Sequence, residues 1–512
     1  MKFDVTSLYN RRAVNRAERI SVGDVMERVT WSFPNKEALI GWKGAYADEE
    51  NKRVTYKQGD EKANQFAHAL LERGLKRGDR VLFYCANSIE YTLAQLGTIK
   101  AGLVVVPVNV MIAPDLLSYI IKSTEPKFLV VDAELYPRGE KIFKENGLET
   151  GVSIPIGGEA IEGSESFSEF ISGKSKNEPE VEIHGDDIFQ IMFTAGTTSL
   201  PKGVMHSHIY LYFCAIGWAL SHARGVPTEI DYKHGVFYPS FHIAGQMMTH
   251  SCLMVGGTAV ITRGPDPQDI VEAISEEKIT TIFGNPVHLS QVCDIVLENP
   301  GKYDVSSVKV LGEGFVSLKL DYMRKYKEVF GEDLLVIGGD GQTECVTDVR
   351  AWYHMFNEKF EKNSLKYNYF GVPHPFYATT AMDENGNICP PGVTGEKVMR
   401  SPCMMAGYYN DERATREAFK FGWFHGGDAV MYDEDGLLIM VDRYKDIIKS
   451  GGENVSSARV EAVLKTHPKV EDAAVIGLPH EQWQEAVTAC VITKPNEKVT
   501  EKELIEYCRE RL

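Results

Sequence analysis

From Tyr56 to Asp132, short apolar runs alternate with segments in which apolar residues recur at helical spacing. Apolar runs of four to six residues are typical of buried strands, and the longer periodic segments are typical of helices that cover a sheet. The pattern predicts helices over 64–75, 88–101 and 114–123 and strands over 80–85, 104–107 and 128–131. This order indicates βαβ units around a parallel sheet.

A second α/β unit is predicted after a polar stretch, 151–187, which is read as a connecting surface loop. It opens with the apolar run 188–193. Later strands are predicted over 259–262, 280–283, 308–311 and 334–337. The last three end in the glycine-containing loops Gly284-Asn-Pro286, Gly312-Glu-Gly314 and Gly338-Gly-Asp-Gly341. Since ligands of such sheets bind at the carboxyl ends of strands, these loops are expected to converge on one site.

Past Gly371 the segments shorten and prolines accumulate, which predicts a small β-rich subdomain. A charged connector, 442–449, precedes a small C-terminal domain with strands over 473–476 and 489–492. Its last helix is opened by Thr500, with Glu503 completing a capping box. That helix has only begun its apolar stripe at Leu512, so we expect the domain to be incomplete in this sequence.

Composition excludes several classes. The chain has 512 residues and a net charge of −17 without a dense block of Lys and Arg, which argues against nucleic-acid binding. Nine scattered cysteines without a C-x-x-C pair argue against a disulfide framework or a zinc site. The N-terminus lacks the apolar core of a signal peptide, and no apolar stretch is long enough to span a bilayer. A cytoplasmic protein is expected.

The segment from Phe193 to Val204 is a small, hydroxyl-rich loop that ends in Pro201-Lys202-Gly203. Glycine lets backbone N–H groups turn toward an anion, hydroxyls add donors, and Lys202 adds a cation, so the loop suits phosphate. It is not a Walker loop, because proline replaces the second glycine and no Ser or Thr follows the lysine. An ordinary surface turn is the alternative.

The loop, together with Gly341-Gln-Thr-Glu344, His425-Gly-Gly-Asp428 and the segment from Asp442 to Asn454, resembles the signatures of the adenylate-forming superfamily in their order along the chain. This family includes acyl-CoA synthetases, luciferases and the adenylation domains of peptide synthetases. The resemblance implies an α/β fold with a large N-terminal domain, 1–441, and a small mobile α+β C-terminal domain, 447–512. Subdomains are expected at about 1–180, 181–370 and 371–441, and a hinge at 442–446.

The resemblance also assigns the phosphate and metal contacts. It implies that Glu344 holds magnesium and that Thr343 contacts the α-phosphate. Ala195 and Ser199 depart from the family's serine and second glycine, so one hydroxyl donor and some backbone freedom are lost. The residues expected to grip the β- and γ-phosphates are Thr194, Gly196, Thr197, Thr198 and Lys202.

For the nucleoside, the family's aromatic residue that stacks on adenine is replaced by Asp340. The resemblance leaves the backbone at Glu313 and Gly314 to read the adenine edge, with Asp340, Gly341 and Gln342 beside it. Asp428 is expected to accept both ribose hydroxyls, joined by Arg443; a turn-forming aspartate and an interdomain salt bridge are the alternatives.

His242 matches the aromatic–histidine pair at the edge of the family's carboxylate pocket, although a lone histidine is more often structural. His206 and His208 are assigned no metal. The small residues of the expected acyl pocket leave volume that favours a fatty or bulky aryl acid over acetate. Its lining residues are His242, Ile243, Ala244, Phe283, Gly284, Gly312, Gly338 and Gly339.

The glycine loop Gly451-Gly-Glu453 resembles the lining of the family's pantetheine tunnel, with Lys445 as the pivot of the hinge; a plain hairpin turn is the alternative. The lysine that bridges the carboxylate and the α-phosphate in the family would lie beyond Leu512.

The sequence is therefore interpreted as an AMP-forming acyl-CoA synthetase that uses ATP, Mg²⁺ and coenzyme A, with Lys202, His242, Thr343 and Glu344 as its catalytic set. A homodimer is possible and no nucleic-acid partner is expected. Two alternatives stay open: transfer of the acyl group to a carrier protein, and a non-catalytic nucleotide-binding homologue. The sequence does not identify the acid, the pathway or the oligomeric state.

Overall fold

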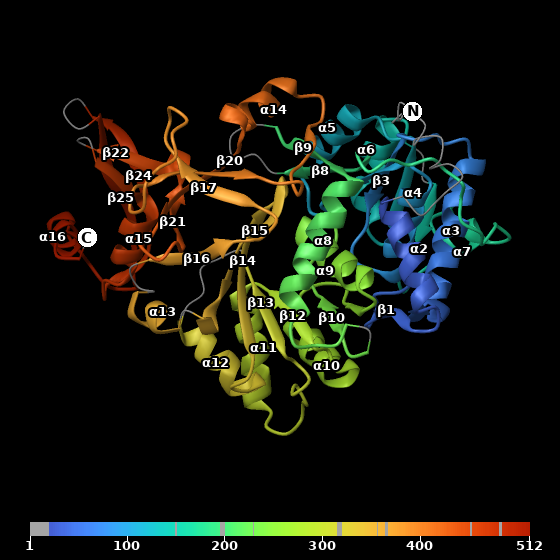
Figure 1. Cartoon of the computed structure of the whole chain (residues 1–512), viewed down its shortest axis with the longest axis horizontal. Helices are drawn as coiled ribbons and strands as arrows, with labels where there is room; N and C mark the ends of the chain where they lie inside the picture. Colours follow the sequence, from blue (N-terminus) through green and yellow to red (C-terminus); the bar gives the residue numbers. More distant parts are fainter. Residues whose placement is uncertain are drawn as a thin grey trace, which may run out of the picture. The chain divides into compact units, whose positions relative to one another are not determined.

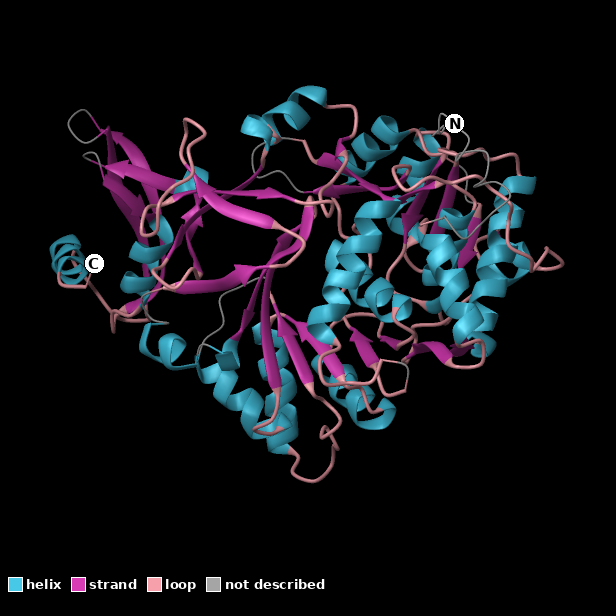
Figure 2. Ribbon diagram, in the orientation of Figure 1, coloured by secondary structure: helices cyan, strands magenta, loops and turns pink. Residues whose placement is uncertain are grey.

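The computed structural model of the chain describes residues 20–148, 151–194, 200–228, 230–314, 320–355, 357–363, 367–450, 453–480 and 484–511. Contacts divide the chain into two compact units (Figures 1 and 2). The first holds residues up to 348 with 352–355 and 401–415, and the second holds 349–351, 356–400 and 416–512.

The first unit contains an eight-stranded sheet in the order β19-β9-β8-β4-β3-β5-β6-β7. The strands from β8 to β7 pair in parallel, whereas β8–β9 and β9–β19 are antiparallel. The bounds are β3 Arg80–Tyr84, β4 Val104–Pro107, β5 Phe128–Asp132, β6 Val152–Ile154, β7 Glu165–Ser166, β8 Ile188–Thr194, β9 Lys202–Ser207 and β19 Gly407–Tyr408. The predicted parallel βαβ layering is confirmed.

A second sheet of the first unit has the order β14-β13-β12-β10-β11-β1-β2, parallel except for the pair β1–β2. The bounds are β1 Glu37–Gly41, β2 Arg53–Thr55, β10 Lys233–Val236, β11 Thr258–Ile261, β12 Thr281–Gly284, β13 Val310–Glu313 and β14 Leu335–Gln342; β15, Cys345–Trp352, follows β14 in the chain. The four strands predicted for this unit are confirmed, with starts within a few residues of the prediction. The last strand, β14, continues to Gln342, so the segment Gly338-Gly-Asp-Gly341 is part of this strand and not the predicted loop.

The helices form where caps and apolar faces coincide. Thr55 and Gln58 make a reciprocal capping box at the start of α3, and Asn285 caps α11, whose first residue is Pro286. The α-helices are α2 Val22–Ser32, α3 Tyr56–Glu72, α4 Ile89–Lys100, α5 Pro114–Thr124, α6 Tyr136–Glu145, α7 Phe167–Ile171, α8 His208–His222, α9 Ile243–Met254, α10 Pro267–Glu277, α11 Pro286–Glu298, α12 Leu320–Phe330, α13 Asn357–Asn363, α14 Glu412–Ala418, α15 Ser457–Lys465 and α16 Glu501–Arg509. Short 3₁₀ turns are η2 Glu49–Asn51, η3 Tyr353–Met355, η4 Lys420–Gly422 and η5 Tyr444–Asp446.

The stretch 151–187 differs from the prediction of a surface loop. It contributes β6, β7 and α7, and Phe167 and Phe170 are buried against Phe66 of α3. Ser166 and Glu169 form a capping box that starts this short helix. Two phenylalanines in a polar stretch are enough to anchor it, because each buries a large apolar surface.

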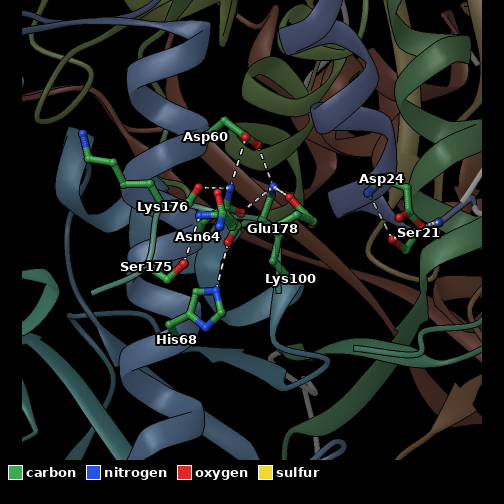
Figure 3. A network of polar contacts seen from close by, with 10 residues as sticks. Ser21, Asp24, Asp60, Asn64, His68, Lys100, Ser175, Lys176 and Glu178 are labelled. Atoms are coloured by element: carbon green, nitrogen blue, oxygen red, sulfur yellow. Dashed lines mark hydrogen bonds and ion pairs between the residues drawn. The ribbon is translucent and has the colours of Figure 1, made fainter. Parts of the chain in front are cut away.

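The same stretch is fixed by a buried cation (Figure 3). Lys100, 1% exposed at the end of α4, places its Nζ 2.6 Å from Asp60 Oδ1, 2.8 Å from Asn64 Oδ1 and 2.5 Å from Glu178 Oε2. Asp60 and Asn64 lie on α3, and Glu178 lies in the segment that leads into β8. A buried charge is tolerated only when it is paired, so this network holds two helices and the approach to β8 together.

The second unit has an antiparallel sheet in the order β17-β18-β20-β21-β16, which confirms the predicted β-rich subdomain. A separate sheet, β23-β22-β25-β24, carries α15 and α16. The bounds are β16 Asn368–Pro373, β17 Ala378–Met382, β18 Gly395–Arg400, β20 Phe424–Tyr432, β21 Leu438–Arg443, β22 Ile447–Ser450, β23 Glu453–Ser456, β24 Val470–His480 and β25 Gln484–Thr493.

The last helix, α16, is capped differently from the prediction. Thr500 accepts a hydrogen bond from the Glu503 N–H as expected, but the Glu503 carboxylate pairs with Lys469 at 3.0 Å. A cation within reach on the neighbouring segment attracts the carboxylate more strongly than the neutral N–H of the cap does. Among the described helices, none is both long and apolar enough to cross a membrane.

Candidate active site

The predicted phosphate loop joins two strands of a hairpin. In β8 and β9, Thr194 lies opposite Lys202, so the first and last phosphate residues are brought side by side. The Lys202 side chain is exposed. The loop residues Gly196, Thr197 and Thr198 lie outside the described residues, so their role stays a prediction.

Lys202 and Glu344 meet through a residue that the sequence reasoning missed. The Nζ of Lys202 lies 4.7 Å from the centre of the Tyr408 ring, and the Tyr408 hydroxyl donates to Glu344 Oε1 at 2.8 Å. Tyr408 is 9% exposed and Glu344 is 8% exposed. Burial, and then the charge of Glu344, raise the pKa of Tyr408, so the phenol keeps its proton. The predicted phosphate cation and the predicted metal ligand thus share one aromatic neighbour.

Thr343 is held through its main chain. Its carbonyl accepts hydrogen bonds from His206 Nε2 at 2.8 Å and from the Tyr210 hydroxyl at 3.1 Å. The His206 Nδ1 is 2.8 Å from Gln190 Nε2, which makes it the acceptor and leaves the proton on Nε2. Burial lowers the pKa of His206 to about 4, so the ring is neutral. His208 has another task, since its Nδ1 accepts from the Val22 N–H.

Three glycines of the predicted acyl pocket differ in whether an added side chain would collide with a neighbour. A Cβ on Gly312 would lie 2.5 Å from His222 Nε2, and one on Gly338 would lie 2.4 Å from the Tyr353 hydroxyl. A Cβ on Gly339 would meet nothing within 4 Å. Gly312 and Gly338 therefore have packing reasons to be glycine, whereas Gly339, within β14, borders open space.

The neighbouring strand ends are firmly packed. Phe283 is 5% exposed and lies edge-on to Trp218, with ring centres 4.9 Å apart, while Gly284 lies against Leu289. Gly314 lies beside the Phe283 ring and the Gly339 carbonyl.

Glu313 is 1% exposed and accepts from the Tyr353 hydroxyl at 3.1 Å, and burial raises its pKa well above the usual range. The side chain is thus a buried acid, which leaves only its backbone for the predicted adenine contact. Asp340, Gly341 and Gln342 are the last three residues of β14, and Gly341 is exposed.

His242 precedes the first residue of α9, Ile243, and its ring packs against Phe241 with centres 4.7 Å apart. The side chain is exposed, yet the atoms that surround the ring desolvate it enough to lower the pKa of His242. Ile243 and Ala244 are half-buried beside it. His242 is therefore accessible to a ligand at the start of α9, unlike a buried core histidine.

In the second unit, both oxygens of Asp428 are paired. Arg443, which lies opposite Asp428 in the β20–β21 pair, reaches Oδ1 at 2.7 Å, and Lys397 reaches Oδ2 at 3.0 Å. Lys397 is 1% exposed and Arg443 is 57% exposed. The sequence offered no signal for Lys397, because a lysine in a short strand is ordinarily taken for a surface residue.

The predicted hinge and thiol loop are only partly described. Lys445 lies in the turn η5, and Glu453 begins β23, but their side chains, together with Gly451 and Gly452, lie outside the described part of the chain. Near the hinge, Asp442 Oδ2 accepts from Ser456 Oγ at 3.0 Å, Ser457 Oγ at 2.9 Å and the Ala458 N–H at 3.1 Å. These bonds tie the end of β21 to the start of α15.

The first unit suits magnesium and a polyphosphate. Mg²⁺ in proteins is usually held by one or two carboxylates together with phosphate oxygens and water, and Glu344 offers one hard oxygen donor that Tyr408 already orients. Lys202 offers an exposed cation beside it. The donor set therefore fits a magnesium–nucleotide complex.

Comparison with known proteins agrees with this reading. The family model described as AMP-binding enzyme matches residues 26–409, and the model of the AMP-binding enzyme C-terminal domain matches 459–512. The chain is 30% identical over 497 residues to 4-hydroxybutyrate–CoA ligase 2 of Metallosphaera sedula, covering 95% of this chain and 88% of that protein. It is 30% identical over 495 residues to a long-chain fatty acid–CoA ligase of Mycobacterium tuberculosis, covering 95% and 92%.

Among solved structures, a fatty acyl CoA synthetase of Mycobacterium tuberculosis superposes with a TM-score of 0.74 at 28% identity, over 96% of this chain and 92% of that one. The o-succinylbenzoate CoA synthetase of Bacillus subtilis, solved with its acyl-adenylate, has the same fold, with a TM-score of 0.77 at 24% identity over 95% and 91%. With the family model spanning most of its length, this chain belongs to the AMP-binding enzyme family of adenylate-forming enzymes.

Proposed function

We propose that the protein is an AMP-forming acyl-CoA synthetase. A carboxylate attacks the α-phosphate of ATP to give an acyl-adenylate and pyrophosphate, and the thiol of coenzyme A then takes the acyl group and releases AMP. The observation that carries the proposal is the meeting of Lys202, Tyr408 and Glu344, since these residues come from three distant parts of the chain.

The chain's own groups have defined tasks in this reaction. Phosphoryl chemistry needs positioning and charge stabilisation rather than covalent help from the protein. Lys202 would neutralise charge on the leaving pyrophosphate. Glu344 would hold Mg²⁺, which supplies further charge neutralisation when bound. Thr343, whose carbonyl is fixed by His206 and Tyr210, would contact the α-phosphate through its side chain.

The other predicted contacts stay part of the proposal. Asp428 would accept the ribose hydroxyls, His242 would face the carboxylate, and Gly339 would line the acyl pocket, where a fatty or aryl acid is expected. The names of the relatives support acid activation in general, since they describe ligases for a hydroxy acid and for long-chain fatty acids.

The test is pyrophosphate and AMP release by the full-length protein with ATP, Mg²⁺ and a panel of short, hydroxylated, long-chain and aryl acids, each with and without coenzyme A. The proposal expects acid-dependent pyrophosphate and coenzyme A-dependent multiple turnover. If turnover instead requires a carrier protein, that protein and not coenzyme A is the acceptor of the acyl group. Nucleotide binding without turnover on any acid would make the protein a non-catalytic homologue.

A further inference from the structure

Tyr408 is held more firmly than an ordinary loop residue. It lies in β19 and pairs with Val204 of β9, two residues after Lys202 in the same strand. Main-chain bonds on both sides fix the segment: the Ala406 N–H donates to the Met205 carbonyl at 2.9 Å, and the Tyr409 N–H donates to the Gly203 carbonyl at 2.7 Å.

The same segment is also bound to the turn that carries Glu344 and to the start of β15. The Met405 N–H donates to the Glu344 carbonyl at 2.8 Å, and Cys345 forms a bridge with Met404. The Tyr408 N–H is satisfied by Thr415 Oγ1 at 2.9 Å. Residues 404–409 therefore span from the main chain of Glu344 to the main chain of β9, so Tyr408 cannot move without disturbing one of them.

The side chain of Tyr408 contacts both functional groups by different chemistry. The face of the ring attracts the Lys202 ammonium, and the hydroxyl donates to the Glu344 carboxylate. The Tyr408 side chain is buried and its hydroxyl is bonded, so it has little conformational freedom left to lose when a ligand binds. It therefore sets the distance between the Lys202 ammonium and the Glu344 carboxylate. Lys202 lies on β9 and Glu344 lies in the turn between β14 and β15, so the tyrosine fixes the spacing of groups from two separate segments.

We infer that Tyr408 is a positioning residue that sets the spacing of Lys202 and Glu344 for the magnesium–ATP complex. The inference rests on the proposed function and goes beyond it, because it gives Tyr408 a task of its own at the site. The hydroxyl aims the Glu344 oxygens for the metal, and the ring holds the Lys202 ammonium beside the same phosphates.

The test compares Tyr408→Phe with a matched control, Tyr409→Phe. Tyr409 is the next residue, and within the described part of the chain its hydroxyl makes no hydrogen bond that would be lost. Binding of ATP to wild type and both variants is measured by calorimetry across a Mg²⁺ titration, and pyrophosphate release is measured with the best acid. Thermal unfolding of each variant checks that it is folded.

Tyr408→Phe is expected to raise the Mg²⁺ concentration for half-maximal ATP binding about tenfold, because a hydrogen bond to a charged group is lost. Tyr409→Phe is expected to leave it unchanged. In the Glu344→Gln background, Tyr408→Phe is expected to add less than about twofold, because two residues that act as one unit are not additive.

Equal Mg²⁺ dependence for Tyr408→Phe and Tyr409→Phe would overturn the inference while wild-type turnover upheld the proposed function. Full additivity with Glu344→Gln would also overturn it, since Tyr408 would then act elsewhere. A wild type that neither binds Mg²⁺–ATP nor turns over would reject the proposed function and the inference together.

Discussion

Replacing Lys397 by methionine tests how the predicted ribose ligand, Asp428, is held. Lys397 is buried with its Nζ 3.0 Å from Asp428 Oδ2, and Asp428 is 8% exposed. Methionine fills the volume of the aliphatic stem but leaves a buried carboxylate with one fewer cation. Breaking a buried ion pair from one side typically costs about 3–5 kcal/mol.

The remaining partner limits the loss. Arg443 still pairs with Asp428 Oδ1 at 2.7 Å, but its side chain is 57% exposed, so solvent screens part of that attraction. We therefore expect Lys397→Met to lower the free energy of unfolding by about 3 kcal/mol, at the low end of that range. Arg443→Gln is expected to cost less than about 1 kcal/mol.

The assay is urea unfolding followed by circular dichroism, with Lys465→Met as the matched control. Lys465 and Asp472 form a pair at 2.8 Å in the same unit, but both side chains are about half exposed, which predicts a loss under about 1 kcal/mol. Adding Asp428→Asn to Lys397→Met is expected to recover part of the loss, because the unpaired charge is removed. If Lys397→Met costs no more than Lys465→Met, the argument from burial is wrong.

Three further predictions concern the predicted acyl pocket and the histidine behind Thr343. Gly312→Ala is expected to destabilise the protein by about 1–3 kcal/mol, because its Cβ would lie 2.5 Å from His222 Nε2; an unchanged melting temperature would contradict this. Gly339→Ala, whose Cβ meets nothing within 4 Å, is expected to leave the melting temperature unchanged while raising the KM for the acid several-fold, and an unchanged KM would remove Gly339 from the pocket. His206→Gln removes an imidazole whose pKa is about 4 in the folded protein and about 6.5 in the unfolded chain. Between these pH values the unfolded chain binds a proton that the folded protein does not. The stabilising effect of the neutral ring is therefore lost as the pH falls through this window. The stability difference between wild type and His206→Gln should shrink by about 1.4 kcal/mol per pH unit in that window, and a difference that stays constant in urea unfolding at pH 4.5 and 7.5 would contradict the burial argument.

The sequence predicted the parallel strands of the first unit well, because buried parallel strands are short continuous apolar runs with few alternatives. It failed over 151–187, where two phenylalanines outweigh a polar composition. The predicted capping role of the Glu503 carboxylate was also wrong, because this carboxylate pairs with Lys469, a cation 34 residues away in the sequence. Such choices depend on tertiary neighbours that local patterns do not encode.

For the candidate site, motifs identified the residues with recognisable chemistry, such as Lys202 and Glu344. They did not identify the residues that hold them. Tyr408, His206 and Lys397 have no motif, because each acts through a contact between residues that are 16 to 206 positions apart, and only the fold brings such residues together. Positioning residues of this kind become visible only in three dimensions.

Activation of a carboxylate through an acyl-adenylate can be followed by tracing the oxygen atoms of the acid. An acid labelled with ¹⁸O in its carboxyl group is incubated with the protein, ATP, Mg²⁺ and coenzyme A, and the nucleotide product is analysed by mass spectrometry. If the acid attacks the α-phosphate of ATP, the AMP that is released will carry one ¹⁸O atom from the acid. Formation of ADP, or transfer of the label to inorganic phosphate, would contradict this mechanism.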